Sequence, residues 1–361
     1  MSGIRRSVVR NAGRLGAAAV ALVTLATPVL AHVDYVTEGS GGYVNPVAFL
    51  ASVLLRPENA ALFAVGGGAA AVATGGYVRL RPFETDLTVA RRTLESYRPY
   101  LPWMFRLSVG LPLVGAGFAG YLFSPAVPTS LRLLQVALGF LLLFGLATRW
   151  VAVAGLGAYL WVLATAWPTP LLAFEYLGGF LGVLLLGSGQ PSADGMLRRL
   201  RVTDGTVLNR LGVGTDPLGA LVARFDAPAA TGAVLRVVVG IQFVYLGVVE
   251  KLMQPGDALQ VVAKYDLTAV VPVAPEMWVA GAGLTEAAVG LLLITGTVTR
   301  ASAAIAFLLF TTTLFGLPDD PVLAHVSLFG LTSALLVTGS GPYAVDQWLS
   351  RRRLLRPDGG E

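Results

Sequence analysis

The sequence predicts an all-α integral membrane protein made of two parallel-repeat four-helix bundles plus one extra N-terminal span. The first observation is composition: mean hydropathy is +0.70 and only 13% of residues are charged, which is typical of chains that cross a bilayer. The second is an internal repeat, and the third is an uneven distribution of arginines among the loops. The main partner expected is therefore the lipid bilayer.

The repeat joins two stretches that align without a gap, residues 133–149 and residues 284–300. Within it Gln135 falls on Glu286, and the pairs of glycines and the closing Thr-Arg fall on each other: Gly139 on Gly290, Gly145 on Gly296, Thr148-Arg149 on Thr299-Arg300. Self-similarity of this length means two copies of one supersecondary unit. We place a degenerate first unit at residues 105–200, an inner linker at 201–231 and the second unit at 232–353.

The N-terminus has the features of a signal peptide at residues 1–31. Arginines come first, an apolar run follows from Leu15 to Leu30, and small residues precede a cleavage position after Ala31. An uncleaved signal anchor is the alternative. Residues 32–104 then form an outer segment, an extra transmembrane helix and an inner loop, and residues 354–361 form a C-terminal tail.

Nine apolar runs are long enough to be read as spans after signal removal. They are Ala60–Val78, Phe105–Phe123, Leu131–Ala147, Trp150–Trp167, Leu171–Leu186, Gly232–Val249, Met277–Thr295, Ala301–Leu317 and Val322–Val337. Val44–Leu55 is too short and is expected to be an outer-surface helix or part of a long first hairpin. The glycines at 66–68 and 75–76 favour close helix packing in the extra span, and the linker is expected to hold a short amphipathic helix around Val207–Phe225.

Basic residues orient this layout. Of the 26 lysines and arginines, 22 fall on one side and only Arg56, Arg132, Lys251 and Lys264 on the other. The positive-inside rule makes the crowded side cytoplasmic. We therefore predict a multi-pass protein of the plasma membrane, with the mature N-terminus outside and the C-terminus cytoplasmic. Each unit has an even number of spans, so the repeats run in the same direction.

Several function classes are excluded. The pI near 9.6 does not indicate a nucleic-acid partner, because the arginines lie in loops beside spans. The chain has no Cys, so thiol redox chemistry and Cys-ligated clusters are excluded. His32 and His325 are the only histidines, which does not support a bis-His haem or a metal site.

Ionisable residues inside spans suggest function, and they gather in the second unit. Glu250 and Lys251 close its first span, Glu286 lies near mid-membrane, and His325 lies one turn into the fourth span. Trp278 adds aromatic surface at the outer level, and Arg236 is an inner anchor. The first unit has Gly120-Tyr121 and Gln135 in place of the charged residues.

Glu286 is the best candidate for a catalytic group. A carboxyl in an apolar environment holds its proton, so it can hydrogen-bond a quinone carbonyl or pass a proton. Pairing with Lys251 or Arg236 is an alternative. An interhelical hydrogen bond that only stabilises the bundle is equally compatible with the sequence.

The second unit resembles the DoxX/DoxD-like family of four-helix membrane proteins. The motifs that carry the resemblance lie between Leu235 and Arg353: Leu235-Arg236…Gly240, Gly247-Val-Val-Glu250-Lys251-Leu252, Glu286…Gly290…Gly296…Thr299-Arg300, His325 and Gly339-Ser-Gly341…Asp346. The family includes the membrane subunit of thiosulfate:quinone oxidoreductase. The resemblance implies that the chain is a quinone-linked or redox-partner membrane subunit. It also implies that the chain uses quinone, has no covalent cofactor and associates with a redox-active partner subunit. A non-enzymatic scaffold or assembly factor and a small-solute transporter remain alternatives, and whether the chain is an enzyme stays open.

Overall fold

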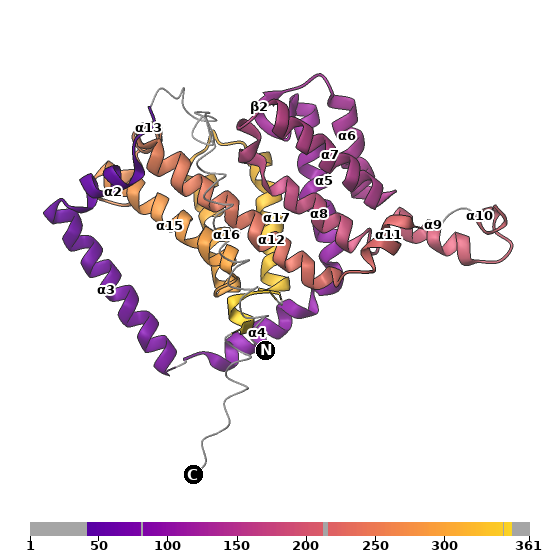
Figure 1. The fold of residues 1–361 in the computed structure, drawn as a ribbon, viewed down its shortest axis with the longest axis horizontal. Helices are drawn as coiled ribbons and strands as arrows, with labels where there is room; N and C mark the ends of the chain where they lie inside the picture. Colours follow the sequence, from indigo (N-terminus) through magenta and orange to yellow (C-terminus); the bar gives the residue numbers. More distant parts are fainter. Residues whose placement is uncertain (1–41, 81, 212–215, 342, 349–361) are drawn as a thin grey trace, which may run out of the picture.

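The computed structural model describes residues 42–80, 82–211, 216–341 and 343–348, and within them the chain is almost entirely helical (Figure 1). The strands within these ranges are β1 (Tyr121–Leu122) and β2 (Ser124–Pro128), which form one small antiparallel hairpin. The all-α fold class is confirmed. The predicted signal peptide, His32 and the tail 354–361 lie outside the described residues.

The first bundle contains four long helices. They are α5 (Leu101–Ala119), α6 (Arg132–Phe144), α7 (Thr148–Thr165) and α8 (Glu175–Leu186). Two short 3₁₀ turns precede α5 and α8, namely η2 (Arg98–Tyr100) and η3 (Thr169–Ala173). The expected span Phe105–Phe123 is too long at its end, because Gly120 adopts a left-handed φ of +90°. This conformation ends the helix and begins the hairpin.

The second bundle repeats the order but extends its first helix. α12 (Ala227–Val244) continues as a π-helix, η4 (Tyr245–Met253), in place of the hairpin. Further helices follow: α13 (Pro255–Lys264), α14 (Leu267–Val270), α15 (Pro275–Thr295), α16 (Thr299–Gly316) and α17 (Val322–Thr338). Helices α12, α15, α16 and α17 correspond to α5, α6, α7 and α8.

Residues at equivalent positions of the predicted repeat form similar hydrogen bonds at one end of each bundle. Arg106 donates to Leu142 O, Leu143 O, Ser188 O and Pro191 O, and Arg236 donates to Ile294 O and Tyr343 O, which are the repeat equivalents of Leu143 and Pro191. Asp194 accepts from the amides that begin α7, just as Asp346 accepts from those that begin α16. These bonds hold Arg236 at this end of its bundle, and its role as an inner anchor stays a prediction.

The two bundles meet through equivalent helices. α5 packs against α17 and α8 packs against α12. Both contacts need a glycine: a side chain at Gly330 of α17 would collide with Ser108 of α5, and one at Gly178 of α8 would lie 3.0 Å from Val238 of α12. Gly178 and Gly330 occupy equivalent repeat positions, so the interface has approximate twofold character.

Four helical segments within the described residues are long and apolar enough to cross a membrane. They are Glu84–Ala119, Ala229–Met253, Pro275–Thr295 and Thr299–Gly316. Helices α6, α8 and α17 are apolar but shorter, and they lie beside the longer ones in the same bundles. The total of nine spans and their orientation stay predictions.

The N-terminal helices stand apart from the bundles. α2 (Pro46–Leu54) and α3 (Pro57–Leu80) are bent by 93° at the break between them, and α4 (Glu84–Ser96) leads back to α5. α3 encloses the predicted extra span, but its glycines do not pack closely against any described residue. Among the residues that the structure describes, nothing lies within 4 Å of a side chain placed at positions 66–68, 75 or 76, and α3 is separated from the bundles in Figure 1.

The linker contains two short helices instead of one amphipathic helix over Val207–Phe225, and a third short helix comes directly before it. In chain order the three helices are α9 (Ala193–Val202), α10 (Val207–Arg210) and α11 (Pro217–Val222). The prediction fails because Pro217 cannot continue a preceding helix. Asp216 caps a new one by accepting from the amide of Gly219.

Candidate functional site

A cluster of ionisable side chains lies where η4, α15 and the α16–α17 loop meet. We call this the outer cluster: Glu250, Lys251, Glu286, Asp320 and His325. We call the end of the bundles that carries it the outer end, after the predicted orientation. Its centre is an ion pair, with Lys251 Nζ 2.8 Å from Glu286 Oε2. Of the two partners that the sequence suggested for Glu286, the structure selects Lys251.

Local backbone geometry brings this pair together. A π-helix has one extra residue per turn and often marks a functional site, and η4 carries Glu250 and Lys251 in such a segment. Glycines allow η4 to approach α15 closely: a Cβ at Gly247 would lie 2.5 Å from Gly283 O. A second close approach, Gly240 against Gly290, holds the helices together further along. The short distance between backbones lets the Lys251 ammonium reach a carboxylate in the middle of α15.

The pair is partly exposed in the described structure, although the Oε2 atom of Glu286 itself is buried. The Lys251 and Glu286 side chains retain 20% and 16% of their accessible surface, whereas Glu250 beside them is buried. A partly open ion pair in an apolar bundle has a donor and an acceptor that a bound polar group can compete for. Of the two alternatives for Glu286, the structure thus shows the one in which its carboxyl group is paired with Lys251.

His325 joins the cluster through Asp320. His325 Nε2 lies 3.5 Å from Asp320 Oδ2, and Nδ1 lies 3.2 Å from Pro321 O. Both side chains are buried. Burial raises the pKa of Asp320 to about 6, and the positive charges of His325 and Lys251 oppose this increase. The effect of Lys251 on Asp320 ties the His–Asp pair to the Lys–Glu pair electrostatically.

The N-terminal segment lies against the back of η4. The amide of Val44 donates to Met253 O at 2.8 Å, and Gln254 Nε2 donates to the Tyr43 hydroxyl at 2.7 Å. Asp257, on the first turn of α13, is also buried here. These contacts fix the end of the π-helix, and with it the direction in which Lys251 points.

Two predicted site residues lie away from the ion pair. Arg236 is bonded at the opposite end of the bundle, so it cannot reach Glu286. Trp278 packs against Ala258 and Val262 of α13, eight residues before Glu286 on α15, or about 12 Å along a helix. Trp278 is placed to line an approach to the outer cluster rather than to contact its centre.

The first bundle lacks this arrangement. Tyr121, which aligns with Lys251, lies in β1, and Gln135, which aligns with Glu286, is fully buried. Neither amide atom of Gln135 has a hydrogen-bond partner within the described structure. The first bundle therefore has no ion pair at this position.

Sequence reasoning missed Asp320 and Asp257. Asp320 was visible only as part of the turn Leu317-Pro-Asp-Asp-Pro321. The sequence feature that could have identified Asp320 is its position five residues before His325, because this spacing places both residues near the start of the same helix. In the ranges that the structure describes, no group of three or more His, Cys, Asp or Glu side chains is placed to hold a metal ion.

Comparison with known proteins gives a family match within the second bundle. Residues 232–318 match the family model DoxX, which covers α12 to α16 and includes Glu250, Lys251 and Glu286. Residues 232–318 of this polytopic membrane protein thus match the DoxX family, and the resemblance predicted from the sequence is confirmed. No curated protein and no solved structure matches the chain.

Proposed function

We propose that the chain is a quinone-linked membrane subunit whose outer cluster binds the quinone headgroup and exchanges protons with it. The observation that carries the proposal is the Lys251–Glu286 ion pair, which only one of two otherwise equivalent bundles contains. A quinone has two carbonyl oxygens that accept hydrogen bonds and an apolar tail that stays in lipid. An ammonium donor beside a carboxylate, at the edge of an apolar bundle, suits such a ligand.

The proposed chemistry divides the work between residues. Lys251 donates a hydrogen bond to one carbonyl oxygen, and Glu286 delivers or accepts the proton at that oxygen. Reduction of a quinone to a quinol takes up two electrons and two protons; Glu286 supplies the proton at one oxygen, and water supplies the second proton at the other. The electrons come from, or go to, a redox-active partner subunit, because the chain has no Cys for an iron–sulfur cluster. His325 and Asp320 connect the proton site to the outer surface.

The test is the quinone content of gently purified protein, measured by solvent extraction and chromatography. Wild type is expected to retain quinone near one molecule per chain, and Glu286→Gln to lose it while remaining folded. Glu276→Gln is the matched control, because it is the same substitution on the first turn of the same helix and lies outside the outer cluster. Equal quinone in wild type and Glu286→Gln, or none in wild type, contradicts the proposal.

A membrane scaffold is the second candidate, and the position of α3 favours it. This helix exposes Leu62, Val65 and Val72 and packs its glycines against nothing in the described chain. Under this alternative a partner protein purifies at fixed stoichiometry with the chain, with or without Glu286. The same preparations therefore distinguish the two candidates: the quinone proposal requires bound quinone that depends on Glu286, whereas the scaffold requires only a bound partner protein.

A further inference from the structure

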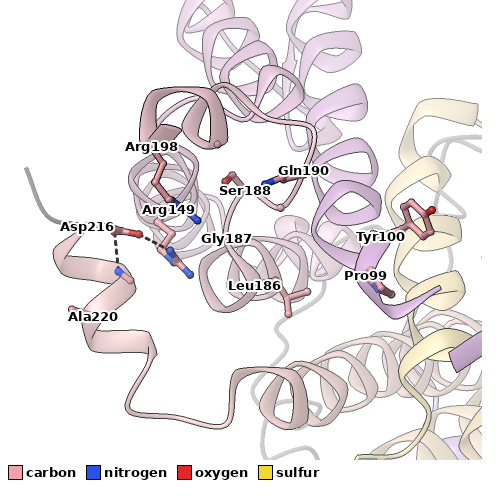
Figure 2. A pocket seen from close by; sticks show the side chains of 13 residues that line it. Pro99, Tyr100, Arg149, Leu186, Gly187, Ser188, Gln190, Arg198, Asp216 and Ala220 are labelled. Carbon is pink, nitrogen blue, oxygen red and sulfur yellow. Dashed lines mark hydrogen bonds and ion pairs between the residues drawn. The ribbon is translucent and has the colours of Figure 1, made fainter. Parts of the chain in front are cut away.

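A second polar site lies at the opposite end of the first bundle, away from the outer cluster. It is a cavity of about 720 Å³ between the start of α5, the end of α8 and the short helices α9 and α11 (Figure 2). Arg149, Arg198, Asp216 and Tyr100 contribute side chains, and the loop Gly187–Gln190 forms one wall. Nothing in the proposed quinone chemistry uses this cavity, so the following argument is independent of that proposal.

The charges around the cavity favour an anion. Arg149 donates through Nε to Leu184 O at 3.0 Å and through Nη1 to Asp216 Oδ2 at 2.6 Å. Asp216 also accepts from the amide of Gly219 at 2.8 Å, so its charge is already compensated. Arg198 is exposed and forms no ion pair with any described residue. Two arginines against one engaged aspartate leave the lining with a net positive charge.

The geometry of the wall adds to this preference. Gly187 and Gly189 have φ of +73° and +59°, which side-chain-bearing residues rarely adopt. A Cβ at Gly187 would lie 2.9 Å from Arg149 Nη2, so glycine leaves this guanidinium nitrogen uncovered. The hydrogen bonds of Arg149 within the described chain use Nε and Nη1, so Nη2 remains available to a ligand. Figure 2 shows Arg149 and Arg198 on the same side of the opening, with Ser188 and Gln190 on the loop facing them.

The surroundings of the cavity are typical of a protein surface at the level of lipid headgroups. Exposed aromatic side chains gather near it at the starts of α5 and α7: Tyr97, Tyr100, Trp103 and Trp150. Tyrosine and tryptophan concentrate where a membrane meets water. The arm formed by α9, α10 and α11 lies beside the cavity, projects sideways in Figure 1 and exposes both apolar and basic residues. That mixture is typical of segments that lie on anionic membranes.

We propose that this cavity binds the phosphate group of an anionic phospholipid. Arg149 and Arg198 hold the phosphate oxygens by charge-assisted hydrogen bonds, the hydroxyl of Ser188 and the amide of Gln190 contact the polar headgroup, and Tyr100 lies at the lipid boundary. The acyl chains remain in the bilayer beside α5 and α8. A free phosphate ion shares the same chemistry, and the experiment distinguishes the two sources.

The experiment is native mass spectrometry of the delipidated full chain, titrated with phosphatidylglycerol, phosphatidylcholine or inorganic phosphate. Tighter binding of phosphatidylglycerol than of either other probe is expected. Arg198→Gln should weaken that binding roughly tenfold, as the loss of one hydrogen bond between charged groups implies, and Arg198→Lys should restore part of it. Arg224→Gln is the matched control, since this exposed arginine lies on the same arm outside the cavity.

Three results would overturn the proposal. Equal affinity for the two phospholipids would show that the cavity does not select an anionic headgroup. Equal weakening of phosphatidylglycerol binding in Arg198→Gln and Arg224→Gln would show that the positive charge of the arm attracts the lipid without a specific site in the cavity. Inorganic phosphate binding as tightly as phosphatidylglycerol would replace the lipid with a free ion.

Discussion

The Lys251–Glu286 ion pair makes a prediction about stability that does not depend on any ligand. At a separation of 2.8 Å, the gross Coulomb attraction is about 6 kcal/mol with an effective dielectric constant of 20. Removing both charges from water offsets most of this attraction. Exposed pairs contribute at most about 1 kcal/mol, and breaking a fully buried pair costs about 3–5 kcal/mol. Both side chains here keep about a fifth of their surface, so we expect a single substitution to cost about 2 kcal/mol.

A double-mutant cycle measures this interaction. Glu286→Gln and Lys251→Met each lower the free energy of unfolding, because each leaves one charge without its partner. The double variant should lose less than the sum of the two, by about 1–2 kcal/mol. Reversible unfolding in mixed micelles gives all four values, and Glu276→Gln should change little. Additive losses, within about 0.5 kcal/mol, would show that the two groups do not interact and would refute the geometry of the outer cluster.

Three further predictions concern the loop, the repeat and the interface. The pKa of Asp320 is raised to about 6 from an ordinary value near 3.8, so the stability that this residue contributes is complete below about pH 4 and is lost as the pH rises through 6. The total loss of unfolding free energy is on the order of 3 kcal/mol. Thermal unfolding measured as a function of pH should show this loss in the wild type but not in Asp320→Asn. Asp346→Ala removes the cap of α16 and should cost about 1–2 kcal/mol in denaturant unfolding, with a similar cost for Asp194→Ala. Gly330→Val should cost about 1–3 kcal/mol through overpacking, whereas Gly281→Val, with open space around it, should be tolerated.

The repeat could be predicted from the sequence because its markers have strict structural duties. Asp194 and Asp346 cap equivalent helices, and Arg106 and Arg236 bond equivalent backbone carbonyls. Each of these contacts requires a particular residue type at a particular spacing. The same residue types therefore align when the two halves of the sequence are compared. The fold class and the boundaries of most long helices follow from the apolar runs between these markers.

The sequence limited the partner of Glu286 in the outer cluster to Lys251 or Arg236 but could not choose between them. Sequence spacing placed Lys251 and Glu286 on neighbouring helices, but it left Arg236 as an equally available partner. The choice depends on the register between η4 and α15, which is set by the contact of Gly247 with Gly283. Hydropathy also cannot distinguish a π-helix from an α-helix or foresee that α3 contacts α2 but stands apart from the two bundles, since these depend on tertiary contacts.

The divergence between the bundles follows a consistent pattern. Their inner ends share arginine and aspartate contacts, as expected where both copies must close the same helical hairpins. Their outer ends differ in backbone as well as side chains: Gly120 ends α5 and begins a hairpin, whereas α12 continues into the π-helix that carries Lys251. A duplicated unit needs only one binding site if the second copy supplies the packing surface. The interface through Gly178 and Gly330 shows that the first bundle supplies such a surface. On this argument the first bundle is under selection for packing, and substitutions at Gln135 should affect stability without affecting a ligand at the outer cluster.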